Sequence, residues 1–260
     1  MRKTILLALT ILLWTVQAGA QFVAPGGTIP AVANIPGENE TFWRSDVSVL
    51  NLSSAATEVV LVLLPELKSS GPTFDPEISD PMPIAGNGQL TLANVVTGVF
   101  GLRNVKGGIS IFSTNGAPLV LASRTYTNAA DGGSYGLNVS GVLVADTAWV
   151  ANVEQDGFFR TNVGVFLPIN PPVGQSLNFT VTIFDANGVE VAEGSLIFSS
   201  AGLRQKDLDF FGLEDVLLDG WVQIRCSDPS AIWYAYATVI DNVTGDSVYR
   251  AAIGQQSSIP

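Results

Sequence analysis

Apolar and polar residues alternate along most of this chain, in short runs that are separated by Gly, Pro and Asn. Residues 46–52 and 57–64 show the pattern clearly and are rich in β-branched side chains. A period of two places successive side chains on opposite faces of a strand. A helical period is limited to a turn or two near residues 94–102 and 207–215, where we expect a short helical turn or corner. The pattern predicts an all-β protein of the sandwich type.

Three strand pairs are expected from the turn signals. Residues 176–198 read as a hairpin whose turn contains Asn187-Gly188, a dipeptide that suits positive φ. Two further pairs are expected around 114–116 and around 228–230, where Gly or Pro interrupts the apolar alternation.

The same series of segments occurs twice, about 115 residues apart. "FWRSDVSVLNLSS" begins at Phe42 and "FFRTNVGVFLPIN" at Phe158. Later, "VVTGVFGL" parallels "DLDFFGLED", and "GGISIFSTNGAPLVLASRTYTN" parallels "DGWVQIRCSDPSAIWYAYATVIDN", in the same order. We interpret this as an internal duplication of a unit that has the size of one domain.

The duplication predicts two homologous tandem antiparallel β-sandwich domains of Ig-like or jelly-roll-like type, over residues 21–142 and 143–260. Residues 67–88 are rich in Pro, Gly and Ser and have no equal counterpart in the second unit. They are expected to form a long loop, a place where function often resides.

The ordered segments resemble a known strand pattern. An apolar strand that ends in "LN" precedes "ATEVVLVLL", a "VVxxVFGL" corner and "GISIFSTNGAPLVLASRTY". This is similar to the β-sandwich of the sensory-rhodopsin transducer family, and more so to tandem sandwich domains of uncharacterised secreted bacterial proteins. The resemblance covers most of both units and implies oligomer-forming sandwiches of a kind that has been compared with carbohydrate-binding modules. It assigns no functional residue, and the transducer family is single-domain and intracellular.

The N-terminus has the features of an export signal. "MRK" is followed by a short apolar run and by "AGA", so residues 1–20 are expected to be a signal peptide and the mature chain to begin at Gln21. No later run is apolar enough to span a membrane, so a secreted or cell-surface protein of bacterial type is expected. Cys226 is the single cysteine and is expected to be a buried apolar residue rather than a reactive thiol.

Charge and composition exclude several functions. The net charge is −11, which disfavours nucleic-acid binding and anionic membrane surfaces because both need clustered Lys and Arg. The chain contains no His, so catalytic triads and His-ligated metals are excluded. An enzyme would have to rely on paired carboxylates, as glycosidases do, and nothing in the sequence pairs them. We therefore expect a non-catalytic protein.

The repeated entry segments contain the first candidate site residues: Trp43 and Arg44 in the first unit, and Phe159 and Arg160 in the second. One interpretation is core packing, with each Arg paired locally or stacked on an aromatic ring. The other is a ligand-facing aromatic-Arg patch that is used twice. Trp43, like the strand-start residues Trp149 and Trp221, is expected to pack into a core.

Aromatic residues alternate in "WYAYATV". If Trp233 points to the core, Tyr234 and Tyr236 share the opposite face of the strand. Exposed there, the two tyrosines could stack on sugars or close a protein interface. Alternatively, they pack beneath a loop or the other domain.

The densest group of acids is Asp207, Asp209, Glu214 and Asp215. Extracellular modules bind calcium weakly through such loops, although no calcium-loop motif is present. The alternative is a solvated corner with turn-capping carboxylates. No other cofactor is expected.

Two functional hypotheses follow. The first is an extracellular structural or adhesion protein that self-associates into oligomers or filaments, or that binds a cell-surface or extracellular polymer, through sandwich faces or edges. The second is a secreted carbohydrate-binding module that uses exposed aromatic residues.

Overall fold

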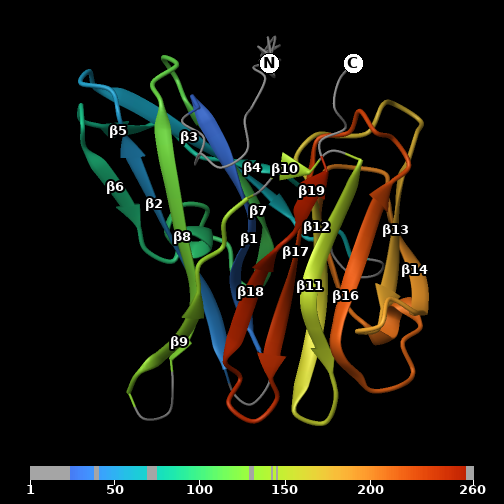
Figure 1. The fold of residues 1–260 in the computed structure, drawn as a ribbon. Coiled ribbons are helices and arrows are strands. Elements are labelled where there is room, and N and C mark those ends of the chain that lie inside the picture. Colours follow the sequence, from blue (N-terminus) through green and yellow to red (C-terminus); the bar gives the residue numbers. More distant parts are fainter. Residues whose placement is uncertain are drawn as a thin grey trace.

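The structure, a computed structural model, describes residues 24–37, 41–68, 75–128, 132–141, 143–144 and 146–255. The expected signal peptide lies outside these residues. The chain is almost entirely antiparallel β-sheet, which confirms the predicted fold class (Figure 1). None of the helices within the described ranges has the length and apolar character that crossing a membrane requires.

The first half of the chain contains strands β1 to β9 and one helical turn. Their bounds are β1 Gly26–Pro36, β2 Phe42–Asn51, β3 Thr57–Pro65, β4 Glu77–Ile78, β5 Met82–Ile84, β6 Gln89–Leu92, α1 Val95–Gly98, β7 Val105–Ser113, β8 Leu119–Asn128 and β9 Ser134–Leu137. The sheet order is β4-β3-β7-β1-β2-β8-β9, with β5 on β3 and β6 on β2. Strand β1 pairs with β7 over most of its length and with β2 only from Asn34 onward, so it belongs to both layers of a sandwich.

The second half contains β10 to β19. Their bounds are β10 Leu143–Val144, β11 Thr147–Gln155, β12 Phe159–Leu167, β13 Leu177–Phe184, β14 Glu190–Phe198, β15 Gly202–Asp207, η1 Asp209–Phe211, β16 Leu217–Cys226, β17 Trp233–Asp241, β18 Ser247–Ala251 and β19 Ile253–Gln255. One sheet has the order β14-β13-β16-β11-β19. The other has the order β10-β17-β12-β15, with β18 on β17.

Both halves connect their strands in the same way. The layer β3-β7-β1 of the first half corresponds in chain order to β13-β16-β11 of the second, and β6-β2-β8-β9 corresponds to β15-β12-β17-β18. The helical turns α1 and η1 occupy the same place in the two series, as expected from the sequence. The duplication and the division into two domains remain predictions, with which this shared connectivity agrees.

Each half has its own core. Every second residue along a strand points into it, as Val47 and Val49 do from β2 and Ile109 and Ile111 do from β7 in the first half. In the second half, the ring of Phe179 packs edge-on against Trp233 and Phe198, each at a centroid distance of 5.1 Å. Cys226 is buried in this core, and burial raises the pKa of its thiol.

A third cluster joins the halves. It contains Leu64 of β3, Phe166 of β12, Leu203 of β15 and Tyr236 of β17. The outer face of β3-β7-β1 therefore packs on the outer face of β12-β17-β15, and the four layers form a stack (Figure 1). Gly108 of β7 makes this possible, because a Cβ there would lie 2.3 Å from the ring of Phe166.

Two of the predicted strand pairs are wrong. Strands β7 and β8 belong to different layers, and so do β16 and β17, so the turns at 114–116 and 228–230 carry the chain from one layer to the other. Apolar alternation on both sides of a turn does not distinguish such a crossover from a hairpin. The hairpin β13–β14 is confirmed, with Gly188 at φ 79° in its turn.

Residues 67–88 are not simply a loop, although 69–74 lie outside the described residues. Two short strands within them, β4 and β5, pair with β3 at the edge of the layer. Ser79 holds this edge, because its Oγ accepts a hydrogen bond from the backbone N–H of Leu61 at 3.0 Å. Prolines flank these strands, as is common where a strand ends a sheet.

Trp149 and Trp221 are not core residues. Both are half-buried on the outer face of β11 and β16, where the ring of Trp221 stacks on that of Phe184 at 3.9 Å and 7°. Their parity within the strands places them opposite the residues that fill the core, such as Val150 and Val222. Position at a strand start does not determine which face a residue occupies.

Candidate functional site between the two halves

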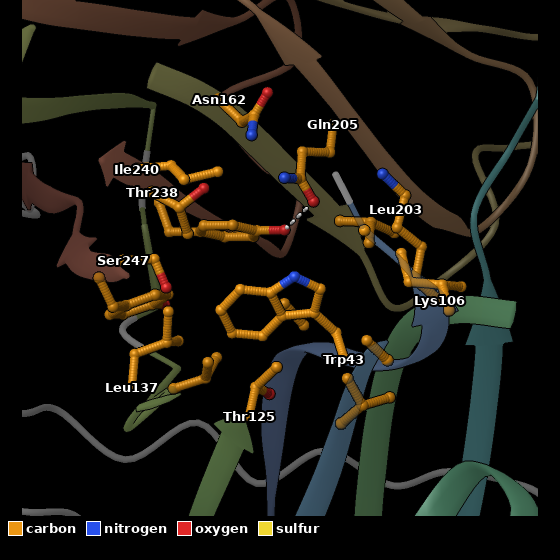
Figure 2. Close-up of a pocket in the computed structure, with 18 of the residues that line it drawn as sticks. Trp43, Lys106, Thr125, Leu137, Asn162, Leu203, Gln205, Thr238, Ile240 and Ser247 are labelled. Atoms are coloured by element: carbon orange, nitrogen blue, oxygen red, sulfur yellow. Dashed lines mark hydrogen bonds between the residues drawn. The ribbon is translucent and has the colours of Figure 1, made fainter. Parts of the chain in front are cut away.

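A pocket of about 310 Å³ lies where the two halves meet. The first half lines it from β1, β2, β7, β8, β9 and the segment that follows β9, and the second half from β12, β15, β17 and β18. Neither half forms the pocket alone. Figure 2 shows side chains from both halves that converge on a shared space around Trp43.

Trp43 is the main contribution of the first half. It lies near the start of β2, opposite Ile35 of β1 in the ladder, and is half-buried with its indole in the pocket (Figure 2). Trp43 shares the strand face of Ser45 and Val47, so it extends the inner face of this layer past the end of the core. Gly37 holds the indole closely, because a Cβ there would lie 2.6 Å from Nε1.

The second half contributes the outer face of its central sheet. Asn162 of β12, Gln205 of β15 and Thr238 of β17 project from adjacent strands into the pocket (Figure 2). Asn162 stands opposite Thr238 in the β12–β17 ladder. Amide and hydroxyl groups that converge on one aromatic side chain give the pocket both hydrogen-bonding and stacking surfaces.

Tyr236 forms the floor between these polar groups. Its ring lies against Gly164, where a Cβ would meet Cζ at 2.3 Å, and stacks on Tyr249 at 5.3 Å. Its hydroxyl donates to Gln205 Oε1 at 3.1 Å, the dashed line in Figure 2. The hydroxyl of Tyr249 donates to the carbonyl of Ser140 at 2.8 Å and so ties β18 to the chain that joins the halves.

Burial sets the ionisation of these tyrosines. It raises the pKa of Tyr236 well above 10.0 and raises the pKa of Tyr249 as well. Burial also raises the pKa of Tyr234, against a smaller opposing effect of its hydrogen bond with Thr28. The phenols are therefore neutral donors, not anions, throughout the physiological pH range.

Two hydroxyl groups in the pocket are buried without a hydrogen-bond partner in the described part of the chain. They are Thr238 Oγ1 and Ser247 Oγ. Ser247 is only 8% exposed, so its hydroxyl has little access to bulk water. Both oxygens have almost no surface exposed to the pocket, so a bound molecule pairs with them only when the side chains rotate toward it. An unpaired buried polar group costs about 1–3 kcal/mol, which such a pairing would recover.

Charged groups border the pocket. Lys106 forms an ion pair with Glu66 at 3.0 Å, which neutralises it. Arg160 Nη1 donates to Asn242 Oδ1 at 2.6 Å. Asp207 Oδ1 accepts a hydrogen bond from the backbone N–H of Phe210 at 3.1 Å. The paired Lys106 and the mixture of Arg160 and Asp207 give the site no single dominant sign of charge.

The structure brings together three of the six ligand-site residues predicted from the sequence: Trp43, Arg160 and Tyr236 all line the pocket. Arg44 does not. It lies on the opposite face of β2, with its guanidinium carbon 5.7 Å from the ring centroid of Phe42 and 5.9 Å from that of Tyr126. This matches the interpretation in which the Arg stacks locally. Phe159 is half-buried and shares the inward strand face of Thr161, away from the face of Arg160.

The hypothesis of an exposed tyrosine pair is wrong. Tyr234 and Tyr236 share one face of β17, opposite Trp233, as the alternation predicted, but Tyr236 is only 1% exposed and Tyr234 is half-buried. The first half of the chain covers that face. The structure therefore has the alternative arrangement, in which the tyrosines pack beneath the other half.

The four acids considered as calcium ligands do not form one site. Asp207 borders the pocket, while Glu214 and Asp215 line a separate depression with Asp185. Asp209 Oδ1 accepts from Gln155 Nε2 at 2.8 Å. Among the described residues, no three carboxylate, His or Cys groups come together as a metal site would require. Asp207 ends strand β15, Asp209 begins the turn η1, and Glu214 and Asp215 follow that turn, so these acids lie apart although they are close in sequence.

Several pocket residues could not be identified from the sequence alone. Asn162, Gln205, Thr238 and Ser247 are ordinary polar positions on alternating strands, and their convergence depends on how one half packs on the other. Only the alternation of side chains along the strands could have indicated them. Asn162 lies on the same face of β12 as Arg160, and Thr238 lies on the same face of β17 as Tyr236.

No protein-family model matches the chain, and no curated protein matches it. Among solved structures, a similarity is found to the crystal structure of Ruminococcus gnavus beta-glucuronidase in complex with uronic isofagomine. The identity is 11% and the TM-score 0.16, over 94% of this chain and 37% of the length of that one. A similarity this weak carries no argument about fold or function.

Proposed function

We propose that this chain is a non-catalytic binding protein whose ligand is a hydroxyl-rich molecule, a sugar ring or the end of a glycan, held in the pocket between its halves. The observation that supports it best is the pair of buried hydroxyls, Thr238 Oγ1 and Ser247 Oγ, in a pocket that also contains Trp43. Sugars present apolar C–H faces and polar rims, and this lining offers a partner to each.

The polar groups suit a ligand that both donates and accepts hydrogen bonds. The amides of Asn162 and Gln205 can do both, and so can the two hydroxyls. The indole of Trp43 offers a flat apolar surface beside them. A purely apolar ligand would leave the hydroxyls unpaired, and a multiply charged one would find Lys106 already neutralised by Glu66.

The pocket volume limits the size of the bound part. At about 310 Å³, it lies at the small end of the range for ligand pockets, roughly 300–1,000 Å³. A single sugar ring or the terminal residue of a chain is a better fit than the middle of a long polymer. Export by the N-terminal signal, expected from the sequence, would place such a site where glycans are abundant.

A glycan array tests this proposal, followed by titration calorimetry of the purified chain with the best sugar. We expect Trp43→Ala to weaken binding at least tenfold, about 1.4 kcal/mol. Trp221→Ala removes a tryptophan from a distant face and should leave the affinity unchanged. Thr238→Val with Ser247→Ala keeps most of the side-chain volume but removes both hydroxyls, and should also weaken binding.

Two results would count against the proposal. One is an array on which no glycan is retained by the native chain. The other is a sugar whose affinity responds to Trp221→Ala but not to Trp43→Ala, because binding would then occur outside the pocket.

A further inference from the structure

At each end of the stack of four layers, one outer face is not packed against another layer of the described residues. Within the chain, the outer face of β3-β7-β1 packs on that of β12-β17-β15. The corresponding faces that remain are the outer face of β2-β8 at one end and that of β11-β16-β13 at the other (Figure 1). The two free faces thus occupy the same places in their own sandwiches as the two faces that already pack together.

The free face of the first half, called here the Arg face, consists of Phe42 and Arg44 of β2 with Arg124 and Tyr126 of β8. Arg124 lies over the ring of Tyr126 at 4.8 Å, and Arg44 contacts the same ring from the neighbouring strand. Arg44 stands opposite Tyr126 in the β2–β8 ladder. Arg160, which occupies the matching position on the packed face of the second half, stands opposite Ile240 in the β12–β17 ladder. Asp46 stands opposite Arg124 on the same face, so the Arg face carries two arginines and one carboxylate.

The free face of the second half, called here the Trp face, consists of Trp149, Phe184, Trp221 and Ile253. The register places Trp221 between Ala151 and Phe184, and Ile253 beside Trp149. Ile253 is 73% exposed, an unusual position for a large apolar side chain next to two tryptophans. Glu193 lies on the same face, where its carboxylate accepts a hydrogen bond from Thr182 at 3.1 Å.

The two end faces complement each other chemically. Guanidinium groups stack favourably on indole and phenyl rings, so Arg44 and Arg124 suit the rings of Trp149 and Trp221. Each face carries charges of both signs: Glu193 on the Trp face offers a counter-charge to the arginines of the Arg face, and Asp46 on the Arg face offers one to Arg225 on the Trp face. The interface within the chain has the same general design, with aromatic side chains of the second half packed on strands of the first.

We propose that a second copy of this chain is the partner of these faces, with the Arg face of one copy packed on the Trp face of the next. Within one molecule, the two halves are joined where one layer packs on another. The proposed contact repeats this packing between two molecules. Because the two surfaces differ, the contact is heterologous, and it extends into an open row unless the rotation between copies closes a ring. This inference rests on surfaces outside the pocket and is independent of the proposed ligand.

Sedimentation velocity of the full chain over a hundredfold range of concentration is the first test. We expect dimers and longer species to increase with concentration. Arg124→Glu should block the Arg face and Ile253→Asp the Trp face, each shifting association at least tenfold to higher concentration. Val243→Asp is the matched control: Val243 is 74% exposed, about the same as Ile253, but lies in the β17–β18 turn.

A mixing experiment distinguishes this contact from a symmetric dimer. The Arg124→Glu chain keeps an intact Trp face, and the Ile253→Asp chain keeps an intact Arg face. Mixed in equal amounts, they should form a dimer of one copy of each and no longer species. A chain that stays monomeric at every concentration would overturn the proposal. So would association that neither variant weakens, or that mixing of the two variants does not restore.

Discussion

The close approach of Tyr236 of β17 to Gly164 of β12 makes a sharp test of the packing at the floor of the pocket. A Cβ at position 164 would lie 2.3 Å from Tyr236 Cζ, 2.5 Å from Cε1 and 2.6 Å from the hydroxyl oxygen. Ordinary carbon–carbon contacts are about 3.5–4.0 Å, so Gly164→Ala forces the ring to move by roughly 1.2 Å or more. Tyr236 is only 1% exposed and Tyr249 stacks on it, so a ring that moves away from β12 must displace Tyr249 or enter the pocket that both tyrosines line.

The expected cost follows from this geometry. Overpacking of this size destabilises by about 1–3 kcal/mol. Displacement of the phenol also weakens its hydrogen bond to Gln205, worth about 1 kcal/mol. Alanine is better than glycine within a strand by about 0.5–1 kcal/mol, which offsets part of the loss. A net destabilisation of roughly 1–3 kcal/mol is therefore expected.

Urea unfolding followed by tryptophan fluorescence measures the effect. The matched control is Gly157→Ala, since a Cβ at Gly157 would have no heavy atom within 4 Å. The control should be as stable as the native chain or slightly more so. If Gly164→Ala is as stable as Gly157→Ala, the packing of Tyr236 against β12 described above is incorrect.

Three further predictions concern stability. Phe166→Ala should destabilise by about 3–5 kcal/mol because its ring fills the contact with β7, which urea unfolding measures directly. Asn51→Ala should cost about 1–3 kcal/mol for each buried group left unpaired, because the Asn51 amide donates to the carbonyls of Ala55 and Ala85. Thermal unfolding measures this cost. A decrease in melting temperature smaller than that of an exposed-site control variant would refute it. Burial raises the pKa of Tyr234, Tyr236 and Tyr249 above 10.0, so the folded chain keeps these phenols neutral where the unfolded chain ionises them. That contribution to stability is complete below pH 10 and is lost as the pH rises further, so absorbance at 295 nm should show these tyrosines ionising together with unfolding, not before it.

The alternation of apolar and polar residues correctly predicts several local features of the fold. The parity of "WYAYATV" correctly placed Trp233 on one face and Tyr234 and Tyr236 on the other. The short helical period near residues 94–102 and 207–215, at matching places in the two series, correctly predicts the turns α1 and η1. These features depend on local sequence alone, which is why a single chain suffices to predict them.

Packing between layers could not be predicted in the same way. The outer face of an isolated sandwich would expose Tyr236, but the first half covers it here, with Phe166 seated against Gly108. The same effect separates the repeated arginines, because Arg44 stays on a free face while Arg160 lines the pocket. Which side of a sheet another sheet covers depends on contacts distant in sequence, and alternation is equally compatible with either side.

The proposed function places a hydroxyl-rich ligand in the pocket between the halves. The most direct measurement is a crystal structure of the chain grown with the sugar that binds best on a glycan array. We expect a sugar ring beside Trp43, with its hydroxyls within hydrogen-bonding distance of Thr238 Oγ1 and Ser247 Oγ. A sugar bound on the Trp face or elsewhere, with no sugar in the pocket, would contradict it.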